Sequence, residues 1–122
     1  MEMSRILIID DTPMMINMLG NALKSDYTII AAKDGEKGIA SAKKHQPALI
    51  LLDVMMPGMT GFEVLEILKN DDDTKDIPVI LLTGDGSDMA KKRGHNTGAI
   101  DYIEKPFEIE VIKERVAKYA RS

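Results

Sequence analysis

The chain has 122 residues, no cysteine and a formal net charge of −4 at neutral pH, with 44% hydrophobic and 30% charged residues. The length fits one domain, 1–122, that can bury a hydrophobic core, and the lack of cysteine excludes disulfides, thiol catalysis and thiolate metal sites. The negative charge offers no footprint for nucleic acid or an anionic membrane, and no apolar stretch approaches membrane-spanning length, so we expect a cytoplasmic protein that binds neither.

Short apolar runs alternate with helical patterns along the whole chain. We expect strands near 5–10, 27–32, 48–53, 78–83 and 100–104, and helices near 13–24, 35–45, 61–70, 86–94 and 107–120. The runs Ile6–Ile9 and Leu49–Leu52 show no alternation with polar residues, which is typical of strands that are buried on both faces. The pattern therefore predicts an α/β fold with a parallel sheet.

Two connecting segments differ from the rest. The run Asn70–Asp76 is acidic but lacks the glycine and the distal glutamate of a calcium loop, so we expect a solvated turn. The fourth predicted helix, 86–94, has few apolar anchors and follows Gly84–Asp85–Gly86, whose two glycines raise the entropic cost of ordering the turn. We expect this helix to be short or mobile.

Polar side chains follow the predicted strands at the points where the strands end. Asp10 and Asp11 follow the first strand, Asp53 ends the third, and Thr83 and Lys105 end the fourth and fifth. Ligands of open α/β sheets bind beyond the carboxyl ends of the strands, and the strand order 2-1-3-4-5 would place the first and third strands about 5 Å apart. Three carboxylates in one pocket repel one another unless protons or a divalent cation compensate, and oxygen ligands favour Mg²⁺ or Mn²⁺ over Zn²⁺.

Each of these residues, taken alone, also has an ordinary structural explanation. An aspartate after a strand is usually a cap or a turn residue. Thr83 alone would be a capping hydroxyl, Lys105 a solvated surface charge, and Tyr102 a half-buried packing residue. Their joint placement at one edge of the predicted sheet favours a functional site over these separate roles.

Four motifs together resemble the receiver domain of two-component response regulators. They are Ile8–Pro13, Leu51–Gly61, Leu81–Gly84 and Gly98–Phe107. They occur in the order and at the spacing of that family, and the resemblance covers essentially the whole chain. It implies a single-domain, flavodoxin-like three-layer sandwich with five parallel strands in the order 2-1-3-4-5 and five helices.

The resemblance assigns a chemical role to the acidic residues. It implies that Asp53 is the phosphoacceptor, and that Mg²⁺ is held by Asp10, Asp11, Asp53 and the main-chain carbonyl of Met55. Phosphoryl transfer to a carboxylate needs an ionised nucleophile and neutralised charge on the transferring oxygens, which these groups can supply. The implied donor is a phosphohistidine on a sensor histidine kinase or a histidine phosphotransfer domain. A receiver of this kind acts on itself and is not an enzyme with a turnover substrate.

The resemblance places a conformational switch beside the acidic pocket. Thr83 and Tyr102 form the implied switch pair, Lys105 binds the phosphoryl group, and a cis bond precedes Pro106. Phosphorylation would draw Thr83 toward the phosphoryl group and let Tyr102 rotate inward. The implied signalling surface, which contacts a downstream effector domain or protein, consists of the fourth helix, fifth strand and fifth helix.

Two other classes of function remain open at this point. A phosphohydrolase of the haloacid dehalogenase type also forms an aspartyl phosphate, but it needs a second acid two residues after its nucleophile. Here Met55 follows Asp53 at that distance, and Thr12 follows Asp10. A receiver-like binding module that signals without phosphorylation commonly lacks one of the acids or the lysine, and this chain has all of them. The phosphorylatable receiver is therefore the favoured interpretation.

The chain departs from the family pattern mainly in the predicted fourth helix. Lys92 and His95 stand where the family usually has apolar residues, and Gly84 stands where it usually has alanine. These changes leave the expected chemistry of the acidic pocket intact. They put the usual signalling surface of the fourth helix in question.

Overall fold

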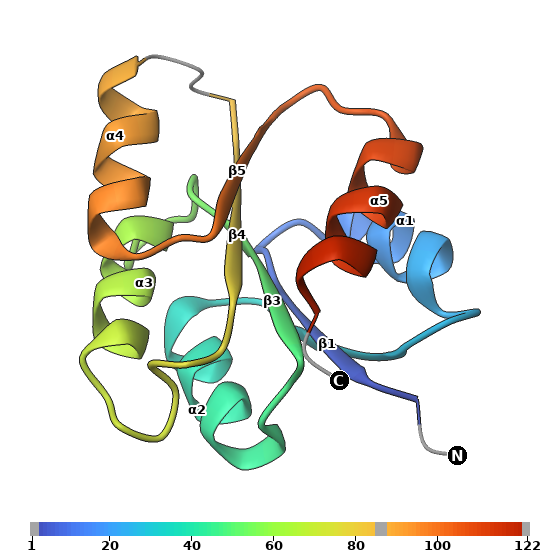
Figure 1. Cartoon of the computed structure of the whole chain (residues 1–122), viewed down its shortest axis with the longest axis horizontal. Coiled ribbons are helices and arrows are strands. Elements are labelled where there is room, and N and C mark those ends of the chain that lie inside the picture. Colours follow the sequence, from blue (N-terminus) through green and yellow to red (C-terminus); the bar gives the residue numbers. More distant parts are fainter. Residues whose placement is uncertain (1–2, 85–87, 121–122) are drawn as a thin grey trace.

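The computed structural model describes residues 3–84 and 88–120, which form a three-layer α/β sandwich around one five-stranded parallel sheet (Figure 1). The strands are β1 (Arg5–Ile9), β2 (Thr28–Ala32), β3 (Leu49–Asp53), β4 (Val79–Thr83) and β5 (Asp101–Glu104). The helices are α1 (Pro13–Leu23), α2 (Gly35–His45), α3 (Gly61–Lys69), α4 (Asp88–Thr97) and α5 (Ile109–Tyr119). The strand order is β2-β1-β3-β4-β5, which confirms the predicted fold class.

The sheet separates two hydrophobic cores, because side chains of successive strand residues point to opposite faces. In β1, Leu7 and Ile9 lie in the core under α2 and α3, whereas Ile6 and Ile8 lie in the core under α1 and α5. All four side chains are fully buried, as expected for a strand covered on both faces. In Figure 1, α2, α3 and α4 lie on one side of the sheet, and α1 and α5 lie on the other.

The start of α3 is fixed against the end of β3. Thr60 and Glu63 form a reciprocal capping box, in which each side chain accepts a hydrogen bond from the backbone N–H of the other residue. A Cβ atom at Gly61 would collide with the carbonyl oxygen of Asp53 and would lie 2.6 Å from the Cα of Val54. Only glycine allows this close approach, which anchors α3 to the strand end that carries Asp53.

The acidic run after α3 is a turn, as expected, but it is more ordered than a solvated loop. The Asp71 carboxylate accepts a hydrogen bond from the backbone N–H of Asp73 and forms an ion pair of 2.7 Å with Lys43 of α2. The Thr74 side chain is 1% exposed, and its hydroxyl donates to the Leu68 carbonyl at 2.7 Å. The amide of Gln46 also donates to the Asp73 carbonyl at 3.0 Å, so α2 and this turn are joined at two points.

The helix α4 differs from the expectation of a short helix ending near residue 94. It continues past Gly94, which is buried against Leu81, and ends before Gly98, whose φ is 112°. The expected start at residue 86 and the expected pliancy of Gly84–Asp85–Gly86 fall mainly outside the described residues. The remaining helix and strand boundaries agree with the predicted ones to within one or two residues. None of the described helices has the length and apolar character needed to cross a membrane.

The buried hydroxyl of Thr74 provides a test of the ordered turn. We expect Thr74→Val to lower the free energy of unfolding by about 1–2 kcal/mol, because the substitution keeps the shape but leaves the Leu68 carbonyl without its donor. Chemical denaturation of both proteins measures the difference. The control is Thr28→Val, an exposed strand position where the change should stay within about 0.5 kcal/mol. Equal losses in the two variants would contradict a specific role of the Thr74 hydroxyl.

Candidate functional site

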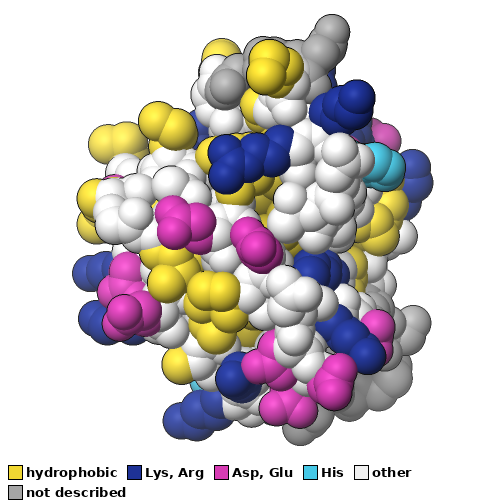
Figure 2. All heavy atoms as spheres, turned by 90° about the vertical axis from the view of Figure 1, so that its left-hand side faces the viewer, with side chains coloured by type: hydrophobic (Ala, Val, Ile, Leu, Met, Phe, Trp, Pro, Cys, Tyr) yellow, Lys and Arg dark blue, Asp and Glu magenta, His cyan; other side chains and the backbone are white. Residues whose placement is uncertain are grey.

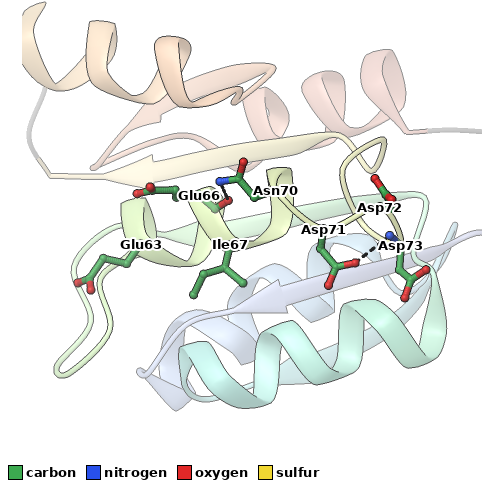
Figure 3. A pocket seen from close by; sticks show the side chains of 7 residues that line it. All are labelled: Glu63, Glu66, Ile67, Asn70, Asp71, Asp72 and Asp73. Atoms are coloured by element: carbon green, nitrogen blue, oxygen red, sulfur yellow. Dashed lines mark hydrogen bonds between the residues drawn. The ribbon is translucent and has the colours of Figure 1, made fainter.

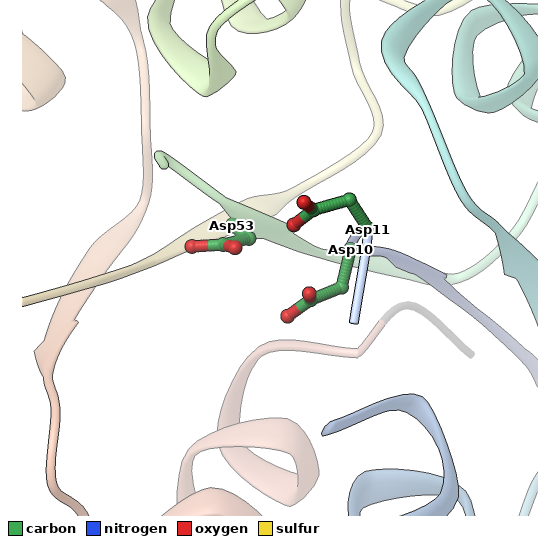
Figure 4. A group of neighbouring side chains, drawn as sticks. All are labelled: Asp10, Asp11 and Asp53. Carbon is green, nitrogen blue, oxygen red and sulfur yellow. The ribbon is translucent and has the colours of Figure 1, made fainter. Parts of the chain in front are cut away.

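Three carboxylates meet where β1 and β3 end. These strands are parallel neighbours in which Ile9 pairs with Leu52, so Asp10 and Asp53 follow at the same edge of the sheet. Carboxylate oxygens of Asp10, Asp11 and Asp53 all lie within 4.8 Å of one another (Figure 4). Asp10 is 1% exposed and Asp53 is 2% exposed, whereas Asp11 is more open to solvent. The structure therefore brings together the three acids that the sequence placed at the strand ends.

Asp10 is the least satisfied member of this acidic pocket. Its Oδ1 accepts a hydrogen bond of 2.9 Å from the backbone N–H of Thr12, but its buried Oδ2 has no partner among the described residues. Burial raises the pKa of Asp10, and repulsion by Asp53 raises it further, although the Thr12 hydrogen bond and the charge of Lys105 lower it. A buried carboxylate oxygen without a donor, next to two more acids, is an arrangement that a hard divalent cation would satisfy.

Asp53 is held in place through one of its two oxygens. The Lys105 ammonium lies 3.1 Å from Asp53 Oδ1, and the backbone N–H of Met55 donates to the same oxygen at 3.2 Å. The Lys105 backbone N–H donates to the Thr83 carbonyl at 2.7 Å, and the bond between Lys105 and Pro106 is cis. Two donors on Oδ1 fix the orientation of the carboxylate, and no described residue donates to its Oδ2.

Thr83 lies beside this pocket, and Tyr102 lies one strand further from it across the sheet. Thr83 ends β4, the strand next to β3, and is fully buried. Tyr102 lies one strand further, on β5, where it pairs with Leu81 and is half-buried. It lines a pocket of about 170 Å³ between α4 and β5. The predicted switch residues are therefore on adjacent strands, but Tyr102 is outside the acidic pocket.

Two glycines support the site by allowing close packing, a role that was not predicted from the sequence. Gly61 allows α3 to approach the Asp53 backbone, as described above. A Cβ at Gly94 would lie 2.7 Å from Leu81 Cδ1 and 3.4 Å from Tyr102 Cδ2, so the absence of a side chain lets α4 pack closely beside Tyr102. The only sequence signal for Gly94 is a glycine inside a helical pattern, which usually has a packing or functional reason.

Comparison with known proteins identifies the family to which the chain is similar. The family model of the response regulator receiver domain matches residues 6–117. The chain is 43% identical, over 98% of its length, to the DNA-binding dual master transcriptional regulator RpaA of Synechocystis sp., of which it covers 50%. It is 36% identical, over 93% of its length, to protein PilH of Pseudomonas aeruginosa, of which it covers 95%. The chain thus spans half the length of one relative and nearly all of another.

The fold is also that of known structures. The chemotaxis protein CheY4 of Vibrio cholerae superposes with a TM-score of 0.91 at 30% identity, covering 96% of this chain and 98% of that one. The similarity extends from sequence to the complete three-layer architecture.

The raised pKa of Asp10 predicts a pH-dependent effect of removing its charge. A carboxyl group whose pKa is raised in the folded state destabilises the fold once it ionises, so the cost is absent below the ordinary value of 3.8 and grows as the pH rises through the raised pKa. In metal-free buffer at pH 7 we expect Asp10→Asn to unfold with a free energy about 1–3 kcal/mol higher than the parent protein. The amide oxygen can still accept the Thr12 hydrogen bond.

Thermal melting from pH 3 to pH 8 measures this effect, and the two proteins should converge at the acidic end. Asp11→Asn is the matched control, since it removes one charge from a more exposed position and should give a smaller gain. An Asp10→Asn variant that is no more stable than the parent at pH 7 would show that the Asp10 carboxylate is not strained in the metal-free protein.

Proposed function

Because this chain belongs to the receiver-domain family of two-component response regulators, we propose that it accepts a phosphoryl group from a phosphohistidine donor onto Asp53. Receiver domains are signalling phosphoacceptors that work with histidine kinases and output domains. The observation that supports the residue assignment is the contact of Lys105 with a buried Asp53 inside a cluster of three acids. Residues 1–122 would form one such domain.

The geometry suits Asp53 as a nucleophile. One oxygen of its carboxylate would form a bond to phosphorus while the bond from phosphorus to the donor histidine nitrogen breaks. The electron pair of the broken bond returns to the imidazole ring, which takes up a proton. Lys105 and the Met55 N–H hold Oδ1, so the carboxylate is oriented in advance and Oδ2 is left for the new bond. Water would later hydrolyse the aspartyl phosphate in the same pocket.

We assign the divalent cation to the acidic pocket. Asp10, Asp11, Asp53 and the main-chain carbonyl of Met55 would hold Mg²⁺ or Mn²⁺, and the unsatisfied Oδ2 of Asp10 fits a ligand position. When bound, such an ion neutralises charge on the transferring phosphoryl oxygens. Lys105, which lies 3.1 Å from Asp53, would supply a second positive charge, and the Thr83 hydroxyl would bind a further phosphoryl oxygen.

The same residues connect the pocket to a surface. Lys105 would move from Asp53 to the phosphoryl group, and its backbone hydrogen bond to Thr83 couples that movement to the end of β4. Tyr102 lines a second pocket of about 490 Å³, between β5 and α5, whose wall includes Phe107 and Val111. We propose that the effector domain or protein is contacted through this α4–β5–α5 surface. A change of a few kcal/mol in the free-energy difference between two positions of Tyr102 would be enough to switch this surface.

Removing the nucleophile tests the proposed function. We expect Asp53→Asn to fold normally and to lose all acid-labile phosphate after treatment with acetyl phosphate and Mg²⁺, because the amide cannot attack phosphorus. Asp26→Asn, at an exposed position outside the pocket, should label like the parent protein. Intact-mass measurement at neutral pH counts the phosphate. Equal labelling of Asp53→Asn and the parent protein would place the phosphoacceptor elsewhere.

Removing the lysine tests the coupling separately. We expect Lys105→Ala to accept some phosphate, because Asp53 remains, but to show a much smaller response of its amide chemical shifts around Thr83 and Tyr102. NMR spectra with and without beryllofluoride, a mimic of the phosphoryl group, measure this response. A response of parental size in the occupied variant would rule out Lys105 as the connection.

A further inference from the structure

The outer face of α3 and α4 carries opposite charges in its two halves. Figure 2 shows this face, with Lys and Arg side chains prominent in its upper part, over α4, and Asp and Glu side chains in its middle and lower part, among further Lys and Arg side chains. The acidic half consists of α3 and the turn that follows it, and the basic half consists of α4. The two helices are in contact, so both halves belong to one continuous surface.

The acidic half is hollowed into a groove of about 750 Å³ (Figure 3). Its lining residues are Glu63, Glu66, Ile67, Asn70, Asp71, Asp72 and Asp73. Ile67, on the middle of α3, is 41% exposed, which gives the groove an apolar patch between its acids. The groove is formed by ordered residues, since Asn70 donates to the Glu66 carbonyl and Asp71 is hydrogen-bonded within the turn.

The groove retains negative charge that the described residues do not neutralise. Asp71 pairs with Lys43 at 2.7 Å, and Asp72 pairs with Lys75 at 3.2 Å. Within residues 3–84 and 88–120, Glu63, Glu66 and Asp73 form no ion pair. Three carboxylates around an exposed isoleucine are therefore complementary to a basic, partly apolar surface.

The helix α4 presents such a surface on the same face. Its Arg93 guanidinium lies 4.3 Å from the centre of the Phe62 ring, so this charge sits where α4 meets α3. Lys92 is exposed and forms no ion pair in the described part of the chain, whereas Lys91 pairs with Glu104. Met89, one turn earlier, is 83% exposed and adds apolar area. The basic half thus matches the acidic half in both charge and hydrophobicity.

We propose that a second copy of this chain binds to this face and forms an isologous dimer, with α4 of each copy against the α3 groove of the other. A two-fold axis that lies in the interface, along the boundary between the basic and the acidic half, places unlike halves together twice. A specific dimer of standard size would bury about 800 Å² per partner, roughly an eighth of the accessible surface of 6801 Å². Both copies carry a net charge of −4 and therefore repel each other at long range. At physiological salt this repulsion is screened beyond about 8 Å, so the charges that face each other across the interface dominate the electrostatic energy.

The experiment measures the mass of the unphosphorylated protein in solution, so it does not depend on Asp53. Sedimentation equilibrium from about 10 μM to 1 mM should show the mass rising from 13.5 kDa toward twice that value. Lys92→Glu should weaken association roughly tenfold or more, because the reversal acts at both symmetric contacts. Lys113→Glu, on an exposed position of α5 with the same change of charge, is the control and should leave it unchanged.

A charge exchange makes the test specific for this face. Glu66→Lys/Asp73→Lys should also associate poorly by itself, but an equimolar mixture with Lys92→Glu should recover the dimer, since both contacts then join unlike charges. Melting curves verify that the variants are folded. A mass of 13.5 kDa at every concentration, a dimer insensitive to Lys92→Glu, or a mixture that stays monomeric would each overturn the proposal. The first of these outcomes would assign the groove to a different partner.

Discussion

Repulsion among Asp10, Asp11 and Asp53 is the constraint on which the rest of this structure depends. Two of the three acids are almost fully buried, and among the described residues the ion pair between Lys105 and Asp53 is the only one that involves these acids. The fold must therefore hold Asp10 with an unsatisfied oxygen and a raised pKa. Such strain is tolerated at functional sites when the surrounding scaffold is rigid, and the two covered faces of the sheet supply that rigidity.

The scaffold also connects this strained pocket to distant surfaces. The backbone of Lys105 is tied to Thr83, and Gly61 fastens α3 to the strand end that carries Asp53. Gly94 lets α4 pack against the ring of Tyr102. A change of charge at Asp53 would therefore act on elements that already contact Asp53. Its effect would reach α4 through the packing of this helix against β4 and β5. The physical route from pocket to surface is short and consists of direct contacts.

The sequence led us to expect that this chain departs from its family pattern mainly in α4, at Lys92 and His95. In the structure both side chains are exposed. The residues that lie near α4 in the fold show how a basic outer surface on this helix is compatible with its packing. The acidic groove of α3 lies on the same face, and the inner surface of α4 is anchored by Ala90, Gly94 and the contact of Arg93 with Phe62. The helix can thus be basic outside and still pack.

The sequence by itself determined the alternation of strands and helices, the burial of β1 and β3 on both faces, and the position of the acids at the strand ends. These follow from local periodicity and from the rule that parallel strands end at one edge. It did not determine the orphaned oxygen of Asp10, the close packing at Gly94, the full length of α4, or the groove beside Ile67. Those features depend on distances between residues far apart in the chain, which only the tertiary structure sets.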